Sequence, residues 1–159
     1  MNRSIASLAG FVVMLTGVPA LWAAGAADHI HVVDPYVRVS PPGVDRTSAY
    51  LILHNTGKTD HALVKAASPA ARVTELHTVM NEGGVMKMRP VEKIALKAGG
   101  ETRLQPGGLH IMLIGLKQPL TEGGKVALTL SFDDGSQKSV QAPVKPVMPG
   151  MDMKMDHHH

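Results

Sequence analysis

Residues 101–114 read ETRLQPGGLHIMLI, and the pattern in this stretch decides the fold. A short run of β-favouring residues is followed by the turn Pro106-Gly107-Gly108 and then by a second run at 109–114. Apolar side chains at 109, 111 and 113 alternate with His110 and Met112. Because successive side chains of a strand point to opposite faces, the pattern predicts a strand–turn–strand unit with His110 and Met112 side by side on one face.

Short runs of β-favouring residues alternate with turns along the rest of the chain. No segment keeps a 3.6-residue apolar period over three turns, so helices are not expected. Turns rich in glycine, proline, asparagine and aspartate separate the runs, as in Asn55-Thr56-Gly57 and Asp133-Asp134-Gly135. The predicted strands are 30–40, 48–54, 62–67, 72–79, 85–91, 101–105, 109–114, 125–132 and 137–142. About nine short strands without helices predict an all-β fold, an antiparallel β-sandwich of two sheets.

Length and composition limit the classes of function. The 159 residues suit one domain, and a hydrophobic content of 44% is enough for a packed core. The formal charge is only +3 and aromatic residues are only 3%, so a nucleic-acid-binding role is not expected. Cysteine is absent, which excludes a disulfide, a thiolate metal site and a cysteine nucleophile.

The first 26 residues are typical of a cleavable export signal. Arg3 supplies positive charge, an apolar stretch follows at 5–21, and Ala24-Gly25-Ala26 is an A-x-A cleavage motif. Polar residues and a proline interrupt the apolar stretch, which argues against a retained membrane anchor. We therefore predict a signal peptide at 1–26, a periplasmic domain at 27–147 and no stable membrane insertion after cleavage.

Histidine and methionine side chains form the candidate chemical site. Met86 and Met88 share one face of their predicted strand, and a hairpin turn would bring His77 towards that face. Thioether sulfur is a soft ligand that suits Cu(I), and imidazole binds copper in either oxidation state. A methionine on a strand is more often core filling, and a lone histidine more often a surface residue. Two His and two Met can surround Cu(I), whereas a blue-copper site normally needs a cysteine thiolate.

The spacing of four of these residues is specific. Ten residues separate His77 from Met88, twenty-one separate Met88 from His110, and one separates His110 from Met112. This H-x10-M-x21-H-x-M pattern resembles that of the periplasmic copper chaperone family PCu(A)C. The flanking segments are similar too, and the resemblance covers about residues 33–144. The segments that carry it are Glu75-Leu76-His77, Gly84-Val85-Met86-Lys87-Met88-Arg89-Pro90-Val91, Pro106-Gly107-Gly108-Leu109-His110-Ile111-Met112-Leu113 and Gly115-Leu116-Lys117-Gln118-Pro119-Leu120.

The resemblance implies a cupredoxin-like β-sandwich that binds Cu(I) near its surface. The sequence shows no candidate catalytic triad or phosphate loop, so enzymatic activity is not expected. It implies delivery of copper toward the copper-bearing subunit of cytochrome c oxidase, beside a thioredoxin-like Sco protein. One departure is Thr78, where many members have Met; Met80 substitutes only if the turn bends it back. The alternative function is a copper-sequestering or tolerance protein that stores copper without delivering it. A copper-dependent oxidoreductase is a third class, and it would need an open coordination position and a substrate pocket.

Secondary metal ligands are predicted outside the four-residue set. Met86 is an occasional Cu(I) ligand beside Met88. Cleavage after Ala26 would place His29 third in the mature chain, where the amine, two amides and the imidazole can chelate Cu(II). His54 and His61 are interpreted as solvated residues. Residues 148–159 form a predicted flexible tail whose soft and hard donors would bind copper, including Cu(II). The tail donors are Met148, Met151, Met153, Met155, His157, His158 and His159.

Overall fold

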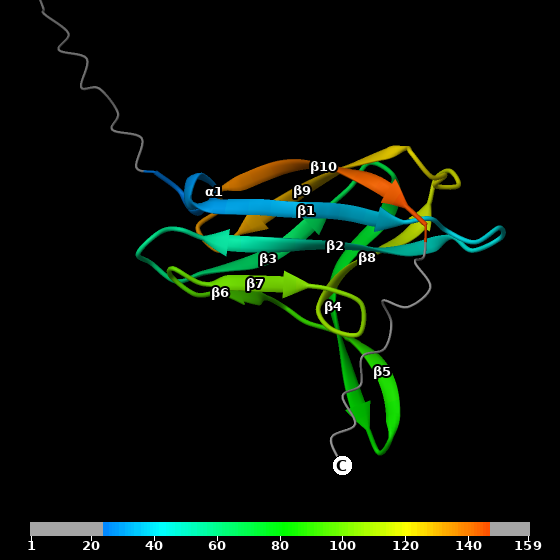
Figure 1. Ribbon diagram of the computed structural model, residues 1–159, viewed down its shortest axis with the longest axis horizontal. Helices are drawn as coiled ribbons and strands as arrows, with labels where there is room; N and C mark the ends of the chain where they lie inside the picture. Colours follow the sequence, from blue (N-terminus) through cyan, green and yellow to red (C-terminus); the bar gives the residue numbers. More distant parts are fainter. Residues whose placement is uncertain (1–23, 147–159) are drawn as a thin grey trace, which may run out of the picture.

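The computed structural model describes residues 24–146, in which ten strands follow one short helix. Figure 1 shows their arrangement and labels them in chain order. The elements are α1 (Ala26–His29), β1 (Ile30–Arg38), β2 (Arg46–Asn55), β3 (His61–Ala67), β4 (Ala71–Glu82), β5 (Val85–Pro90), β6 (Ile94–Leu96), β7 (Glu101–Leu104), β8 (His110–Leu116), β9 (Lys125–Phe132) and β10 (Gln137–Lys145).

The strands form two groups that meet at β1 and β10. One group runs β5-β4-β8-β2-β1, with β7 paired to the second half of β2, and the other runs β10-β9-β3-β6. The groups join where Val37 and Arg38 of β1 lie parallel to Val144 and Lys145 of β10. Every other pairing among the described strands is antiparallel. The predicted all-β, antiparallel architecture is therefore confirmed, with one short parallel seam.

The core between the two groups is built from alternating strand residues. Ile111 and Leu113 of β8 are fully buried, as are Leu128 and Leu130 of β9 and Phe132 at its end. Burying one such side chain stabilises the fold by about 1.5–3 kcal/mol. Because Ile111 and Leu113 point into this core, His110 and Met112 between them occupy the opposite face of β8.

The predicted strands match the observed ones closely, with two differences. The expectation of about nine strands was one short, because the three residues of β6 are too few to give a periodic signal. Helix α1 was not predicted, and the expected domain boundary at residue 27 lies inside it. Within residues 24–146 no helix is long and apolar enough to cross a membrane.

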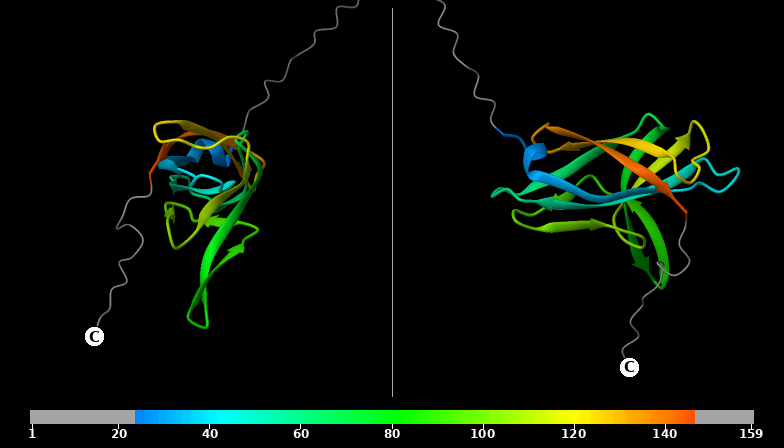
Figure 2. Two further views of the ribbon diagram at one scale, coloured as in Figure 1. Left: turned by 90° about the vertical axis from the view of Figure 1, so that its right-hand side faces the viewer. Right: turned by 45° about the horizontal axis from the view of Figure 1, so that its top comes forward.

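Strands β4 and β5 form a hairpin that projects from the sandwich (Figures 1 and 2). The pairing of β4 with β8 ends at His77 and His110, and beyond that point β4 pairs only with β5, up to Glu82 and Val85. Gly83 and Gly84 close the turn with φ angles of 62° and 86°, which suits a two-residue type I′ hairpin. All six residues of β5 are exposed. The hairpin tip is thus held by its own ladder and not by the core.

Candidate metal centre

Strands β4 and β8 place two predicted ligands directly opposite each other. His77 and His110 are register partners, so their side chains lie on the same face of the sheet. Their ring centroids are 5.7 Å apart. Glu75 is the register partner of Met112 and continues the same row. The sheet therefore brings His77, His110 and Met112 together on one face.

The His110 imidazole presents a nitrogen lone pair on the sheet face that it shares with His77. Its side chain is only 2% exposed. Nδ1–H donates to the carbonyl oxygen of Gly108 at 3.0 Å, which leaves Nε2 as the unprotonated nitrogen. Burial lowers the pKa of His110, and the neighbouring His77 and Arg38 lower it further, against the opposing effect of the Gly108 hydrogen bond. His110 is therefore neutral at pH 7, and its Nε2 has no hydrogen-bond partner in the protein.

The His77 imidazole is held by a hydrogen bond at Nε2, whereas His110 is held at Nδ1. Nε2–H donates to a carboxylate oxygen of Glu75 at 2.7 Å, so Nδ1 carries the lone pair. That Nδ1 atom is buried and has no partner. A buried nitrogen without a partner costs about 1–3 kcal/mol. Two such nitrogens on facing rings fit an ion that accepts both lone pairs.

The two predicted sulfur ligands differ in their surroundings. Met112 is half-buried on β8, and the Ser48 hydroxyl donates to its sulfur at 3.5 Å. Met88 lies on β5 opposite Val79, which puts it on the same face as His77 and diagonal to it. Met88 is 56% exposed. One thioether is therefore fixed by the sheet, and the other lies open on the hairpin.

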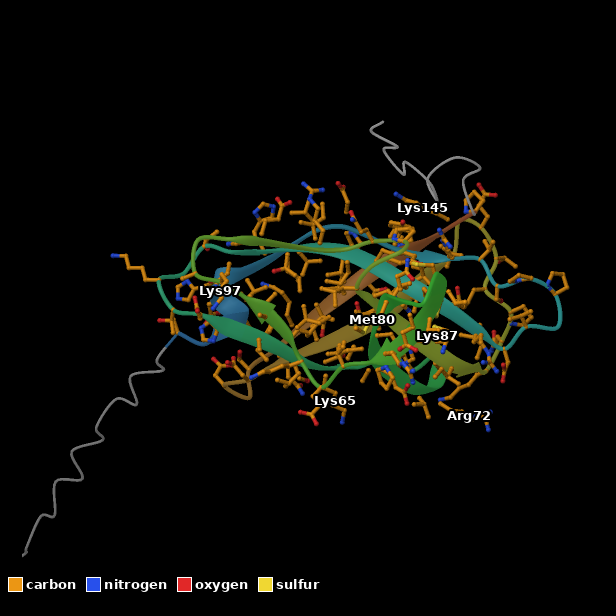
Figure 3. All side chains as sticks on the ribbon, turned by 90° about the horizontal axis from the view of Figure 1, so that it is seen from below. Lys65, Arg72, Met80, Lys87, Lys97 and Lys145 are labelled. Carbon is orange, nitrogen blue, oxygen red and sulfur yellow. The ribbon has the colours of Figure 1, made fainter. Side chains whose placement is uncertain are left out.

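Met80 and Met86 take different positions on the hairpin. Met86 is opposite Asn81, on the face of Met88 but one step nearer the turn, and it is 52% exposed. Met80 pairs with Lys87 on the other face of the hairpin, and both are labelled in Figure 3. The turn does not bend Met80 back, so Met80 cannot replace the methionine missing at Thr78.

The remaining predicted ligands lie away from this place or outside the structure. His29 ends α1, next to the start of β1, whereas Arg38 at the other end of β1 is near His110. The predicted tail ligands Met148, Met151, Met153, Met155, His157, His158 and His159 lie outside the described residues. His54 pairs with Glu101 at 2.8 Å and His61 with Asp133 at 3.1 Å, which gives both histidines ordinary protein partners.

Aromatic and basic side chains form the wall beside His110. The Tyr50 ring lies 6.3 Å from His110, and Tyr36 lies 5.2 Å from Tyr50. Arg38 stacks over Tyr50 at 5.2 Å, and Lys145 stacks over Tyr36 at 5.3 Å. This wall excludes water from one side of the imidazole pair, which explains how His110 is buried while facing away from the main core.

Sequence analysis did not identify three groups that hold these ligands. They are the Glu75 carboxylate, the Gly108 carbonyl and the Ser48 hydroxyl, each of which contacts one ligand. Hydrogen bonds of this kind fix the tautomer and orientation of metal ligands. The Glu75-Leu76-His77 segment was visible in the sequence, but only the strand pairing shows that Glu75 faces Met112 as well.

The donor set determines what the centre can bind. It offers two imidazole nitrogens and two thioether sulfurs, a combination that suits Cu(I) better than Zn, Mg or Ca. Among residues 24–146, no three His, Cys, Asp or Glu side chains cluster so that they could hold a metal ion.

Comparisons with known proteins show the family to which this chain belongs. Residues 30–144 match the family described as "Putative lipoprotein LpqE-like". The chain belongs to this family. The "Putative lipoprotein Lxx21020" of Leifsonia xyli subsp. xyli is 38% identical over 120 residues, covering 75% of this chain and 71% of the relative. An uncharacterized Rickettsia prowazekii protein, RP573, is 34% identical over 119 residues, covering 72% of this chain and 66% of that protein.

Solved structures similar to this LpqE-like chain include a copper-loaded protein and a PCuAC domain. The Cu(I) form of DR1885 from Deinococcus radiodurans is 38% identical with a TM-score of 0.59, covering 77% of this chain and 81% of that one. A copper-bound PCuAC domain from PmoF2 has a TM-score of 0.65 at 20% identity, covering 77% of this chain and 97% of that one. The second likeness concerns the fold alone. The predicted cupredoxin-like fold and the resemblance to PCu(A)C proteins are both confirmed.

Proposed function

We propose that this LpqE-like protein binds one Cu(I) ion through His77 Nδ1, His110 Nε2 and the sulfurs of Met88 and Met112. The observation that carries the proposal is the pair of facing imidazoles, each with one buried nitrogen that lacks a partner. Each of these rings is held by a hydrogen bond at its other nitrogen. The solved Cu(I) form of DR1885, which is 38% identical to this chain, supports the choice of metal.

We further propose that the protein is a chaperone that passes copper on, and not a store. Met88 lies on an edge strand and is 56% exposed, so an acceptor can approach and replace that thioether first. Thioethers are neutral ligands, and their release needs no proton. A store would be better served by ligands that are all buried. The exposed sulfur therefore supports transfer by stepwise ligand exchange.

The family resemblance supports a proposal for the place of action and for the partners. The predicted export signal supports a periplasmic location, as does membership of a family described as lipoproteins. We propose that the acceptor is the copper-bearing subunit of cytochrome c oxidase and that a thioredoxin-like Sco protein is a further partner. The predicted tail at 148–159 would capture copper, including Cu(II), and pass it to the folded centre. Truncation after residue 146 should then remove most Cu(II) binding and leave one Cu(I).

Anaerobic Cu(I) titration tests the binding centre. The mature protein should take up one Cu(I) on the β-domain, and the double variant Met88→Leu/Met112→Leu should bind it far more weakly. Leucine keeps a similar volume, so the free energy of unfolding should change by less than about 1.5 kcal/mol per substitution. Met80→Leu is the matched control, because Met80 is as exposed as Met88 but lies on the other face. Unchanged affinity in the double variant would overturn the assignment.

Mixing experiments distinguish the chaperone from the store. The Cu(I)-loaded protein is mixed with the apo form of the oxidase copper subunit, and copper on each protein is measured with time. A chaperone should transfer its single ion quickly. A copper-sequestering protein would bind several ions and retain them in the presence of the acceptor.

A further inference from the structure

The segment just before β1 is seated in the fold by the turn between β9 and β10. Ala26 is fully buried, and its backbone N–H donates to Asp134 Oδ2 at 2.6 Å. The next residue, Ala27, donates from its N–H to Ser136 Oγ at 2.9 Å, and its carbonyl accepts from Lys138 Nζ at 2.7 Å. Figure 1 shows α1 beside the start of β10. Two contacts with this turn and one with Lys138 of β10 make residues 26 and 27 part of the domain.

The turn itself is organised around the Asp134 carboxylate. Ser136 donates to Asp134 Oδ1 from its hydroxyl at 2.6 Å and from its backbone N–H at 2.9 Å. Oδ2 is left to face Ala26. The hydrogen bonds from Ser136 and Ala26 lower the pKa of Asp134 to about 2, so this carboxylate is charged at every physiological pH. A charged oxygen that meets a single N–H is well placed to receive a cation.

The sequence offers several small-x-small cleavage motifs in this region. Cleavage after Ala26 uses Ala24-Gly25-Ala26 and cleavage after Ala27 uses Gly25-Ala26-Ala27. Both remove the buried Ala26 and leave Asp134 Oδ2 without its donor. Cleavage after Ala23 or Ala24 would put Leu21 or Trp22 at the position that needs a small residue. Cleavage after Gly25 uses Ala23-Ala24-Gly25 and keeps Ala26 in the mature chain.

We propose that signal peptidase cuts between Gly25 and Ala26, and that the new Ala26 ammonium forms an ion pair with the Asp134 carboxylate. Hydrolysis of the peptide bond converts the neutral Ala26 N–H into an ammonium at the same place. The turn between β9 and β10 then acts as a receptor for the processed end of the chain. One consequence is that His29 becomes the fourth residue of the mature protein. The three-residue Cu(II) chelate at the amino terminus then does not form.

The cleavage position is tested by intact mass. The full-length precursor is expressed in a bacterium that exports it, and the mature protein is purified from the periplasm. The expected mass is that of a chain starting at Ala26. A chain starting at any other residue, upstream or downstream, would overturn the proposal. This measurement needs no variant, so it does not depend on the folding of a mutant.

The ion pair is tested by comparing two chains, one starting at Ala26 and one at Ala23, each released from a fusion protein without extra residues. Only the first has an ammonium at Ala26. A free α-amino group has a pKa near 8, and pairing with a carboxylate raises it. The stabilisation is therefore present below pH 8 and lost as the pH rises through the raised value.

Thermal unfolding from pH 7 to pH 10 should lower the Tm of the Ala26 chain by about 3 °C more than that of the Ala23 chain. Asp134→Asn in both chains should abolish this difference, while the histidines titrate alike in all four proteins. Parallel pH profiles of the two unsubstituted chains would contradict the ion pair.

Discussion

Strands β8 and β5 each supply one sulfur to the proposed copper centre, but they are opposite in character. Strand β8 lies between β4 and β2, and its Ile111 and Leu113 are fully buried. Strand β5 is an edge strand, and all its residues are exposed. The inner strand presents His110 and Met112 at positions fixed by the core. The edge strand presents Met88 where a second protein can reach it. We therefore expect β8 to determine the affinity for Cu(I) and β5 to determine its release.

The two faces of the hairpin differ in a similar way. On the face that carries Met80 and Lys87, Glu82 accepts hydrogen bonds from Arg89 at 2.9 and 3.0 Å and lies 3.0 Å from Lys87. On the opposite face, near the turn, Met86 and Met88 pair with the uncharged residues Asn81 and Val79. Exposed ion pairs contribute at most about 1 kcal/mol. Their main effect is to gather charge on the face that carries Met80, so that the uncharged face of Met86 and Met88 is the one left for an acceptor.

The largest effect should come from the inner strand. His110→Ala removes the most buried ligand, and we expect Cu(I) affinity to fall by more than about 100-fold, beyond the usual cost of losing a second-shell partner. Competition with a Cu(I) chelator of known affinity measures this. His54→Ala is the control, because His54 pairs with Glu101 and not with the centre. A loss of less than tenfold in His110→Ala would show that β8 is not the anchor.

A smaller loss is expected at Glu75, which holds His77 in the tautomer with a free Nδ1. Glu75→Ala should weaken Cu(I) binding by about tenfold, because the ring can then rotate and exchange tautomers. Glu75→Gln retains an acceptor oxygen and should recover most of the affinity. The nitrogen chemical shifts of His77 report the tautomer directly. Equal affinity for Glu75→Ala and the unsubstituted protein would contradict the role of the carboxylate.

Hydrogen exchange should sharpen the contrast between the strands. Amides of the hairpin tip should exchange at least about tenfold faster than those of β8, since the tip opens without unfolding the core. Gly83→Ala places a side chain at a φ of 62° and costs about 1 kcal/mol or more locally. It should speed exchange in the tip and leave β8 unchanged. If β8 amides accelerate equally, the hairpin and the sandwich open as one unit.

The smallest effect concerns the pH dependence of the metal-free protein. Burial keeps the pKa of His110 in the folded protein below its usual range. As the pH falls below about 6.5, His110 therefore binds a proton in the unfolded chain before it does so in the folded one. Stability is therefore present above pH 6.5 and is lost toward lower pH, by at most about 1.4 kcal/mol per pH unit. Urea unfolding at pH 7.5 and 5.5 measures this loss. His110→Gln should show less of it, and an equal loss would exclude His110 as the cause.

Local pattern was enough to predict most of the fold and the strand faces on which the candidate ligands lie. Alternation at 109–113 predicted the face shared by His110 and Met112, and the glycine pair at 83 and 84 predicted the hairpin. The direct pairing of His77 with His110 joins strands far apart in the sequence, and local periodicity carries no information about that register. The bond that Ser48 donates to Met112 depends likewise on the register of β2 with β8. The bonds that Glu75 and Gly108 accept are local, but they depend on side-chain rotamers that strand alternation does not specify.

The two tyrosines give this protein a built-in optical probe. Tyr36 and Tyr50 are the only tyrosines in the sequence, and the single tryptophan, Trp22, belongs to the predicted signal peptide. Tyr50 is 6.3 Å from His110, and Tyr36 is 5.2 Å from Tyr50. Once the signal peptide is removed, all intrinsic fluorescence arises beside the imidazole pair. Arrival and departure of a metal ion can therefore be timed from the emission of the unlabelled protein.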